Sequence, residues 1–156
     1  AINETQFQMV TFQLGDELYG IHIMDVKEIV KVQTVRPIPN APYYMEGIIN
    51  LRGDIIPIID LHKRFHIAEA EDVDIDLDSG FIILNIEGSL IGIFIDKISR
   101  VVTIESSQVQ EPPQMISGIG REYIEGVVKS DSGYLIMIDT YKLFDPSELQ
   151  KILENK

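Results

Sequence analysis

Two histidines, His62 and His66, stand four positions apart, the spacing that aligns side chains on one face of a helix. Imidazoles in such an arrangement can ligate zinc, but a zinc site needs a further ligand. The catalytic order His-Glu-x-x-His is absent. We therefore interpret the pair as lying on a short surface turn, and we predict no metal and no cofactor. His22 stands among apolar residues of an expected strand, which favours packing or surface exposure over catalysis.

An acidic run lies near the middle of the chain. Residues 74–80 resemble a calcium-binding loop, but the glycine stands at position seven of that loop where position six is required. Asn85 occupies position twelve, which calls for glutamate. We interpret residues 68–79 as a solvated acidic linker between two halves of the chain.

The tripeptide Arg52-Gly53-Asp54 matches a cell-adhesion motif, which would require an exported protein. The first residues, Ala1 to Glu4, lack the basic and apolar pattern of a secretion signal. A tight hairpin turn is the better interpretation. An arginine at an exposed tip can fork onto a carboxylate or stack on an aromatic ring, so Arg52 is either a binding residue or a solvated turn residue.

The composition excludes several classes of protein. The 156 residues include no cysteine, which rules out disulfides, thiolate metal sites and cysteine nucleophiles. No Ser-His-Asp order or glycine-rich phosphate loop is present, so we expect a protein that is not an enzyme, although a hydrolase on a small barrel is one alternative. A net charge of -12 argues against a nucleic-acid-binding barrel and against anionic membranes. No apolar run reaches the roughly 18 residues of a membrane span.

Short runs rich in Ile and Val, separated by glycine-centred turns, predict a mainly β fold. Many short strands with close turns are typical of barrels or sandwiches. The expected strand pairs are residues 7–14 with 17–23, 46–51 with 54–59, 81–86 with 90–95, and 122–128 with 134–138.

Helices are expected to be few and short. Asp60 and Asp139 follow strands and can cap helical turns over residues 61–65 and 140–144. The run Asp145-Pro146-Ser147-Glu148 combines an aspartate cap, a proline at the first position and a glutamate at the third. It predicts a C-terminal helix.

The two halves of the chain resemble each other. Residues 44–65 match residues 123–144 at a constant shift (123 − 44 = 79), and residues 18–23 match residues 90–95 at a shift of 90 − 18 = 72. The repeat predicts two copies of about five strands each. Their approximate bounds are 12–65 and 84–144.

Three stretches, Gly15–Ile21, Val26–Ile29 and Gly47–Leu61, resemble the CheW family in their order and spacing. The tip Asn50-Leu51-Arg52-Gly53, followed by an apolar strand with an internal proline, is the most distinctive part. The resemblance covers about residues 7–145. It implies a single CheW-like domain over residues 1–156, with two SH3-like five-stranded β-barrels around a shared core, short helices and a C-terminal helix.

The resemblance also implies a function without catalysis. CheW proteins are cytoplasmic adaptors that couple chemoreceptors to the CheA histidine kinase in bacterial chemotaxis, at receptor arrays on the membrane. The implied partners are the regulatory domain of CheA, itself CheW-like, and the cytoplasmic tip of methyl-accepting chemoreceptors. An alternative is the excised regulatory domain of a CheA kinase or the adaptor half of a CheV-type protein. The final residues Glu154-Asn155-Lys156 favour a stand-alone adaptor.

The family's binding positions can be placed on this sequence. Those implied for receptor binding are Val26, Glu28, Gly47, Arg52, Ile98 and Val101. Those implied for kinase binding lie at the hairpin tip: Asn50, Leu51, Gly53 and Asp54. From the residues alone, Val26 and Glu28 also fit an ordinary short helix or strand. Ile98 and Val101 fit the core as well as a contact surface.

Overall fold

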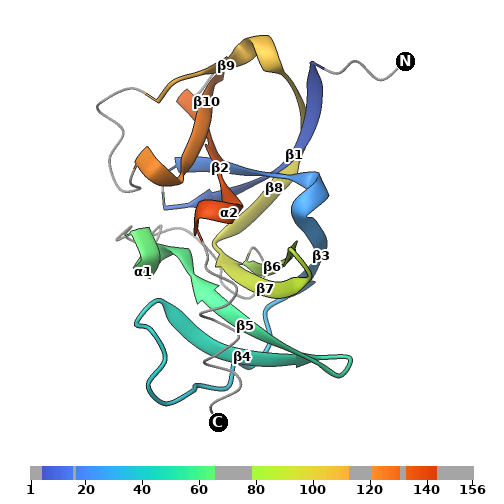
Figure 1. Cartoon of the computed structure of the whole chain (residues 1–156), viewed down its shortest axis with the longest axis vertical. Coiled ribbons are helices and arrows are strands. Elements are labelled where there is room, and N and C mark those ends of the chain that lie inside the picture. Colours follow the sequence, from blue (N-terminus) through green and yellow to red (C-terminus); the bar gives the residue numbers. More distant parts are fainter. Residues whose placement is uncertain (1–4, 16, 66–78, 113–120, 131–132, 144–156) are drawn as a thin grey trace.

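A computed structural model describes residues 5–15, 17–65, 79–112, 121–130 and 133–143. Within these residues the chain forms two β-sheets with a few short helical turns (Figure 1). This confirms the predicted mainly β, two-barrel fold. The predicted C-terminal helix, His66 and all of the acidic linker except Ser79 lie outside the described residues.

The first sheet has six strands in the order β8-β1-β2-β11-β10-β9. Their bounds are β1 (Gln6–Leu14), β2 (Glu17–His22), β8 (Lys97–Glu105), β9 (Val109–Gln110), β10 (Ile124–Ser130) and β11 (Gly133–Ile138). A short turn, η2 (Ser106–Gln108), connects β8 at one edge to β9 at the other. Because β9 pairs with β10, this connection brings the two edges of the sheet together and closes it toward a barrel.

The second sheet has five strands in the order β3-β6-β7-β5-β4. Their bounds are β3 (Val26–Lys31), β4 (Met45–Leu51), β5 (Asp54–Asp60), β6 (Gly80–Ile86) and β7 (Ser89–Ile95). Beyond β3 the chain crosses to the far edge. There Arg36 and Ile48 exchange two backbone hydrogen bonds of 2.8 and 2.9 Å. This crossing closes the second sheet in the same way as the first.

Both predicted helical turns are present as α1 (Leu61–Phe65) and α2 (Thr140–Leu143). The carboxylate of Asp60 accepts a hydrogen bond of 2.9 Å from the backbone N–H of His62, and Asp139 accepts one of 3.1 Å from that of Tyr141. The predicted aspartate caps are therefore confirmed. The remaining turns are η1 (Ile23–Asp25) and η3 (Arg121–Tyr123).

The strand register preserves the sequence repeat. Gly20 lies opposite Met137 in a parallel pair, and their repeat equivalents Gly92 and Ile58 lie opposite each other in the other sheet. The two copies are nevertheless exchanged between the sheets. The hairpin β1–β2 joins strands β10 and β11 of the second copy, and the hairpin β6–β7 joins strands β3 to β5 of the first.

Buried apolar residues in the described part of the chain form three clusters. The largest lies between the sheets and draws buried residues from both, including Phe12, Tyr19, Ile82 and Ile138. Each sheet also has a cluster of its own. One is Met9, Ile104, Val128, Leu135 and Met137, and the other is Ile49, Ile56, Ile58, Phe81 and Ile83. A fully buried side chain of this size contributes roughly 1.5–3 kcal/mol, so the shared cluster stabilises the pair of sheets as one unit.

Candidate functional site

The tip of the β4–β5 hairpin is a two-residue turn. Arg52 and Gly53 both have positive φ, 51° and 92°, as a type I′ hairpin turn requires. The side-chain oxygen of Asn50 accepts a hydrogen bond of 3.0 Å from the backbone N–H of Gly53. Leu51 is half-buried against the apolar cluster of its own sheet. These contacts fix the tip and present the Arg52 side chain outward.

Arg52 forms an ion pair with Glu28 of β3. Glu28 lies on the edge strand β3, and Arg52 lies in the turn that follows β4, the opposite edge strand, so the pair connects the two edges of the five-stranded sheet. The Arg52 side chain stays 65% exposed and that of Glu28 27% exposed. The structure thus brings together two of the predicted receptor residues and leaves the guanidinium largely accessible to a partner.

Strand β3 places its residues alternately on two faces. Val26 and Glu28 are half-buried, whereas Lys27 between them is exposed. Val26 packs against the edge of the shared cluster. The structure therefore decides between the helix and the strand that the sequence left open, in favour of the strand.

Ile98 and Val101 lie on β8, in the other sheet. Ile98 is half-buried against the shared cluster, and its Cδ1 lies 3.0 Å from the place that a Cβ on Gly80 would occupy. Since Gly80 pairs with Lys31, Ile98 sits beside the end of β3. Val101 is 48% exposed. The six predicted receptor residues are thus divided between the two sheets.

Gly47 is buried where the chain crosses β4. Its φ is 147°, and a Cβ there would lie 2.1 Å from the carbonyl oxygen of Arg36. Its position explains why this residue is a glycine. The predicted kinase residues Asn50, Gly53 and Asp54 are exposed at the tip. They share that tip with Arg52.

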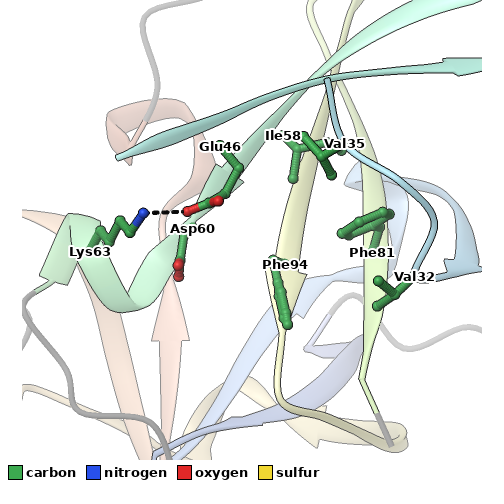
Figure 2. A pocket seen from close by; sticks show the side chains of 8 residues that line it. All are labelled: Val32, Val35, Glu46, Ile58, Asp60, Lys63, Phe81 and Phe94. Atoms are coloured by element: carbon green, nitrogen blue, oxygen red, sulfur yellow. Dashed lines mark ion pairs between the residues drawn. The ribbon is translucent and has the colours of Figure 1, made fainter. Parts of the chain in front are cut away.

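A pocket of about 350 Å³ opens on the five-stranded sheet (Figure 2). Its walls are apolar and come from Val32, Val35, Ile58, Phe81 and Phe94. On the rim, Lys63 of α1 forms a 2.6 Å ion pair with Glu46 of β4, close to the carboxylate of Asp60. Such a pocket can accept an apolar side chain. Among the described residues, no group of three or more His, Cys, Asp or Glu side chains could hold a metal ion.

His62 does not lie on a surface turn, so that interpretation is wrong. Its side chain is 6% exposed and its ring lies between two carboxylates. Nδ1 is 2.9 Å from Oδ1 of Asp60, and Nε2 is 2.7 Å from Oδ1 of Asp96. The second contact is close enough for an ion pair, although its direction is not that of a hydrogen bond.

These contacts set the protonation of the group. Burial by itself lowers the pKa of His62, but the hydrogen bond to Asp60 and the attraction of Asp96 outweigh it and raise the pKa to about 9. Burial also tends to raise the pKa of Asp60, yet the hydrogen bond from His62 prevails and leaves it lowered.

Arg64, also on α1, lies between two tyrosines. Its guanidinium carbon is 5.0 Å from the centre of the Tyr44 ring and 4.9 Å from that of Tyr123, and it donates a 2.9 Å hydrogen bond to the Tyr123 hydroxyl. The two tyrosines are repeat equivalents, so Arg64 contacts the same position in both copies. The sequence signal for both His62 and Arg64 is a departure from the repeat, because Tyr141 and Leu143 stand at the matching positions.

Comparisons with known proteins point to one family. The model of the CheW-like domain matches residues 8–148. A curated "Chemotaxis protein CheW" of Treponema pallidum is 62% identical, over 97% of this chain and 90% of its own length. Another, from Klebsiella aerogenes, is 34% identical over 91% of this chain and 84% of its own length.

A solved structure shows the same fold. The scaffolding protein TtCheW from Thermoanaerobacter tengcongensis superposes with a TM-score of 0.80 at 38% identity, covering 92% of this chain and 90% of its own. In the described part of the chain, none of the helices has the length and apolar character needed to cross a membrane.

Proposed function

The chain belongs to the CheW-like domain family, and from this premise we propose that it couples chemoreceptors to the CheA histidine kinase as a non-enzymatic adaptor. It acts in the cytoplasm, at receptor arrays on the membrane. Its partners are the regulatory domain of CheA and the cytoplasmic tips of methyl-accepting receptors. The relatives named above are chemotaxis proteins, and the structural neighbour is a scaffolding protein, which supports this role.

The observation that carries the proposal is the ion pair of Arg52 and Glu28. A surface ion pair contributes little to stability, with a median of about 0–1 kcal/mol, so folding alone gives little reason for it. Here it connects the edge strand β3 to the tip of the β4–β5 hairpin and holds an exposed guanidinium at that tip. Such a group can recognise a carboxylate or an aromatic face on a partner at fixed orientation.

The positions of the predicted receptor residues support a role in coupling the receptor to the kinase. Val26 and Ile98 occupy equivalent positions in the two copies, and each packs at the edge of the shared cluster with part of its surface accessible. A receptor that contacts both sheets can change how the two sheets are held against a bound kinase. This requires contacts that differ between the active and inactive states of the complex.

The test is titration calorimetry against two separate partners from the same organism: the regulatory domain of its CheA kinase and a receptor cytoplasmic fragment. We expect saturable one-to-one binding by the wild type. Arg52→Ala should weaken binding of at least one partner about 30-fold, the loss expected for a hot-spot residue of roughly 2 kcal/mol. Arg52→Lys keeps the charge but not the planar fork, and should recover only part of the affinity.

Lys27→Ala is the matched control, since Lys27 is an exposed cation on the face of β3 that points away from Glu28. It should bind both partners as the wild type does. Loss of receptor binding with retained kinase binding in Val26→Ala or Val101→Ala would assign those residues to the receptor surface. If the folded wild type binds neither partner, the coupling role is wrong.

A further inference from the structure

The strongest unexplained feature lies away from the tip, at the crossing between the two sheets. Asp96 stands between β7 of one sheet and β8 of the other. Its Oδ2 accepts a 2.9 Å hydrogen bond from the backbone N–H of Gly15, in the β1–β2 turn, and its Oδ1 faces Nε2 of His62. Its backbone N–H donates to the carbonyl of Gln13 at 3.2 Å. Asp96 thus connects α1, which follows the five-stranded sheet, to the β1–β2 hairpin of the six-stranded sheet.

The geometry around His62 specifies a charge state. A neutral imidazole carries one N–H and one lone pair, so it can donate to only one of two flanking carboxylates. The other contact would place a nitrogen lone pair against a carboxylate oxygen, at 2.9 or 2.7 Å. With both carboxylates ionised, both contacts are favourable only if both ring nitrogens carry protons. All three side chains are nearly inaccessible, with 6% exposure for Asp96 and 12% for Asp60, so water cannot relieve the mismatch.

We propose that His62 is an imidazolium at neutral pH that fastens the two sheets together through α1, and that its deprotonation loosens the crossing at Asp96. The charged groups around it are Asp60 at the end of β5, Asp96 at the crossing, and Lys63 on its own helix, which is paired with Glu46. The edge of Phe94 closes another side at a ring-centre distance of 6.2 Å. Removal of the proton leaves two buried carboxylates without a cation between them.

The sign of the pH dependence follows. The pKa of folded His62, about 9, lies above the ordinary value of 6.5, so the proton favours the folded state. This stabilisation is complete below pH 6.5 and is lost as the pH rises through about 9. His62 therefore keeps its charge in mildly alkaline solution, where most histidines have already lost theirs, and loses it only as the pH passes about 9.

The decisive measurement is the imidazole region of long-range ¹H–¹⁵N NMR spectra of the full chain, recorded from about pH 6 to 10 across the expected titration. We expect two protonated ring nitrogens for His62 at neutral pH and a titration midpoint near 9, with the Gly15 amide shift following the same curve. His22 is an internal reference. Among the described residues, it contacts a carboxylate through Nε2, that of Glu125 at 3.0 Å, and its side chain is 29% exposed.

Asp96→Asn tests the cause. It keeps the size of the side chain but removes one charge, so the His62 midpoint should fall by at least about one pH unit. The decrease in the urea midpoint between neutral and alkaline pH should also become smaller. The control His22→Gln should leave the His62 midpoint unchanged.

A His62 ring with one protonated and one bare nitrogen at neutral pH would overturn the proposal, because a carboxyl group would then hold the shared proton. An unshifted midpoint in folded Asp96→Asn would overturn it as well. Should that variant fail to fold, the wild-type spectrum still decides the charge state.

Discussion

At the scale of single residues, Gly47 shows how a close backbone crossing constrains one position. The backbone of Arg36 passes directly over it and pairs with Ile48. Its φ of 147° is also one that side chains with a Cβ rarely adopt. The position is therefore required for closing the barrel, whatever it contributes to receptor binding.

We expect Gly47→Ala to lower the free energy of unfolding by roughly 2–4 kcal/mol, through backbone strain and the clash with Arg36. Urea denaturation followed by circular dichroism measures the loss. The control is Gly53→Ala, where φ is also positive but no atom lies within 4 Å of the new Cβ. It should cost about 1–2 kcal/mol. Equal losses in the two variants would show that the crossing at Arg36 is unimportant.

Residue-level prediction succeeded where the local pattern sufficed. The turn at Arg52-Gly53 and the aspartate caps depend on neighbours in the chain, and all of them are as predicted. The burial of His62 depends on Asp96, which is brought close only by the pairing of distant strands. A single sequence carries no direct signal of that proximity.

At the scale of elements, the two tight hairpins of the five-stranded sheet use the same turn chemistry. In β4–β5, Asn50 accepts from the N–H of Gly53, and in β6–β7, Asn85 accepts from the N–H of Gly88, both at 3.0 Å. Because β5 and β7 are parallel, the two tips lie at the same end of the sheet. They differ in charge, with arginine at position 52 and glutamate at position 87.

Because the two turns have the same hydrogen bond, substitutions in them can distinguish an effect on stability from an effect on kinase binding. We expect Asn50→Ala and Asn85→Ala each to cost about 1 kcal/mol, the value of one lost hydrogen bond. Only Asn50→Ala should also weaken kinase binding, since the predicted kinase residues lie at its tip. Denaturation midpoints and calorimetry on the two variants give the comparison. Equal loss of binding in both would remove the kinase surface from the β4–β5 tip.

Element boundaries were largely predictable because glycine-centred turns separate the strands. The predicted hairpin strands agree with the structure to within a few residues. The strands β3 and β8 were not predicted, because neither is bounded by a glycine-centred turn. The pairing order of the strands also could not be deduced, because alternation shows which face of a strand is buried but not which strand lies beside it.

At the scale of the whole molecule, α1 lies at the junction of the two copies. His62 binds the crossing between the sheets, and Arg64 lies between the paired tyrosines Tyr44 and Tyr123. Phe65 is buried in the shared cluster. A five-residue helix therefore holds both barrels with three side chains.

We expect Arg64→Met to reduce the free energy of unfolding by roughly 1–3 kcal/mol, because a desolvated cation–π contact is worth up to about 2 kcal/mol and a hydrogen bond about 1 kcal/mol. Lys63→Met is the matched control. It removes the neighbouring cation, whose exposed ion pair with Glu46 should be worth less than about 1 kcal/mol. Chemical denaturation of both variants tests the difference, and similar losses would contradict a special role for Arg64.

The exchange of hairpins between the sheets predicts how the chain responds to being cut. Two fragments divided within residues 66–78 should each fail to fold alone, since each lacks strands of both sheets. Mixed in equal amounts, they should recover the circular dichroism spectrum of the intact chain. A fragment that folds cooperatively by itself would show that one copy is autonomous.

The same exchange bears on ancestry. Two identical chains that traded their first hairpins would form an intertwined homodimer with the strand pairing seen here, and Arg64 would then contact the equivalent tyrosine of each chain. Joining the end of one chain to the start of the other would turn that dimer into a single chain with this fold. After gene fusion the two copies could diverge in sequence, so that one copy has Arg64 where the other has Leu143. A single arginine could then contact the tyrosines of both copies.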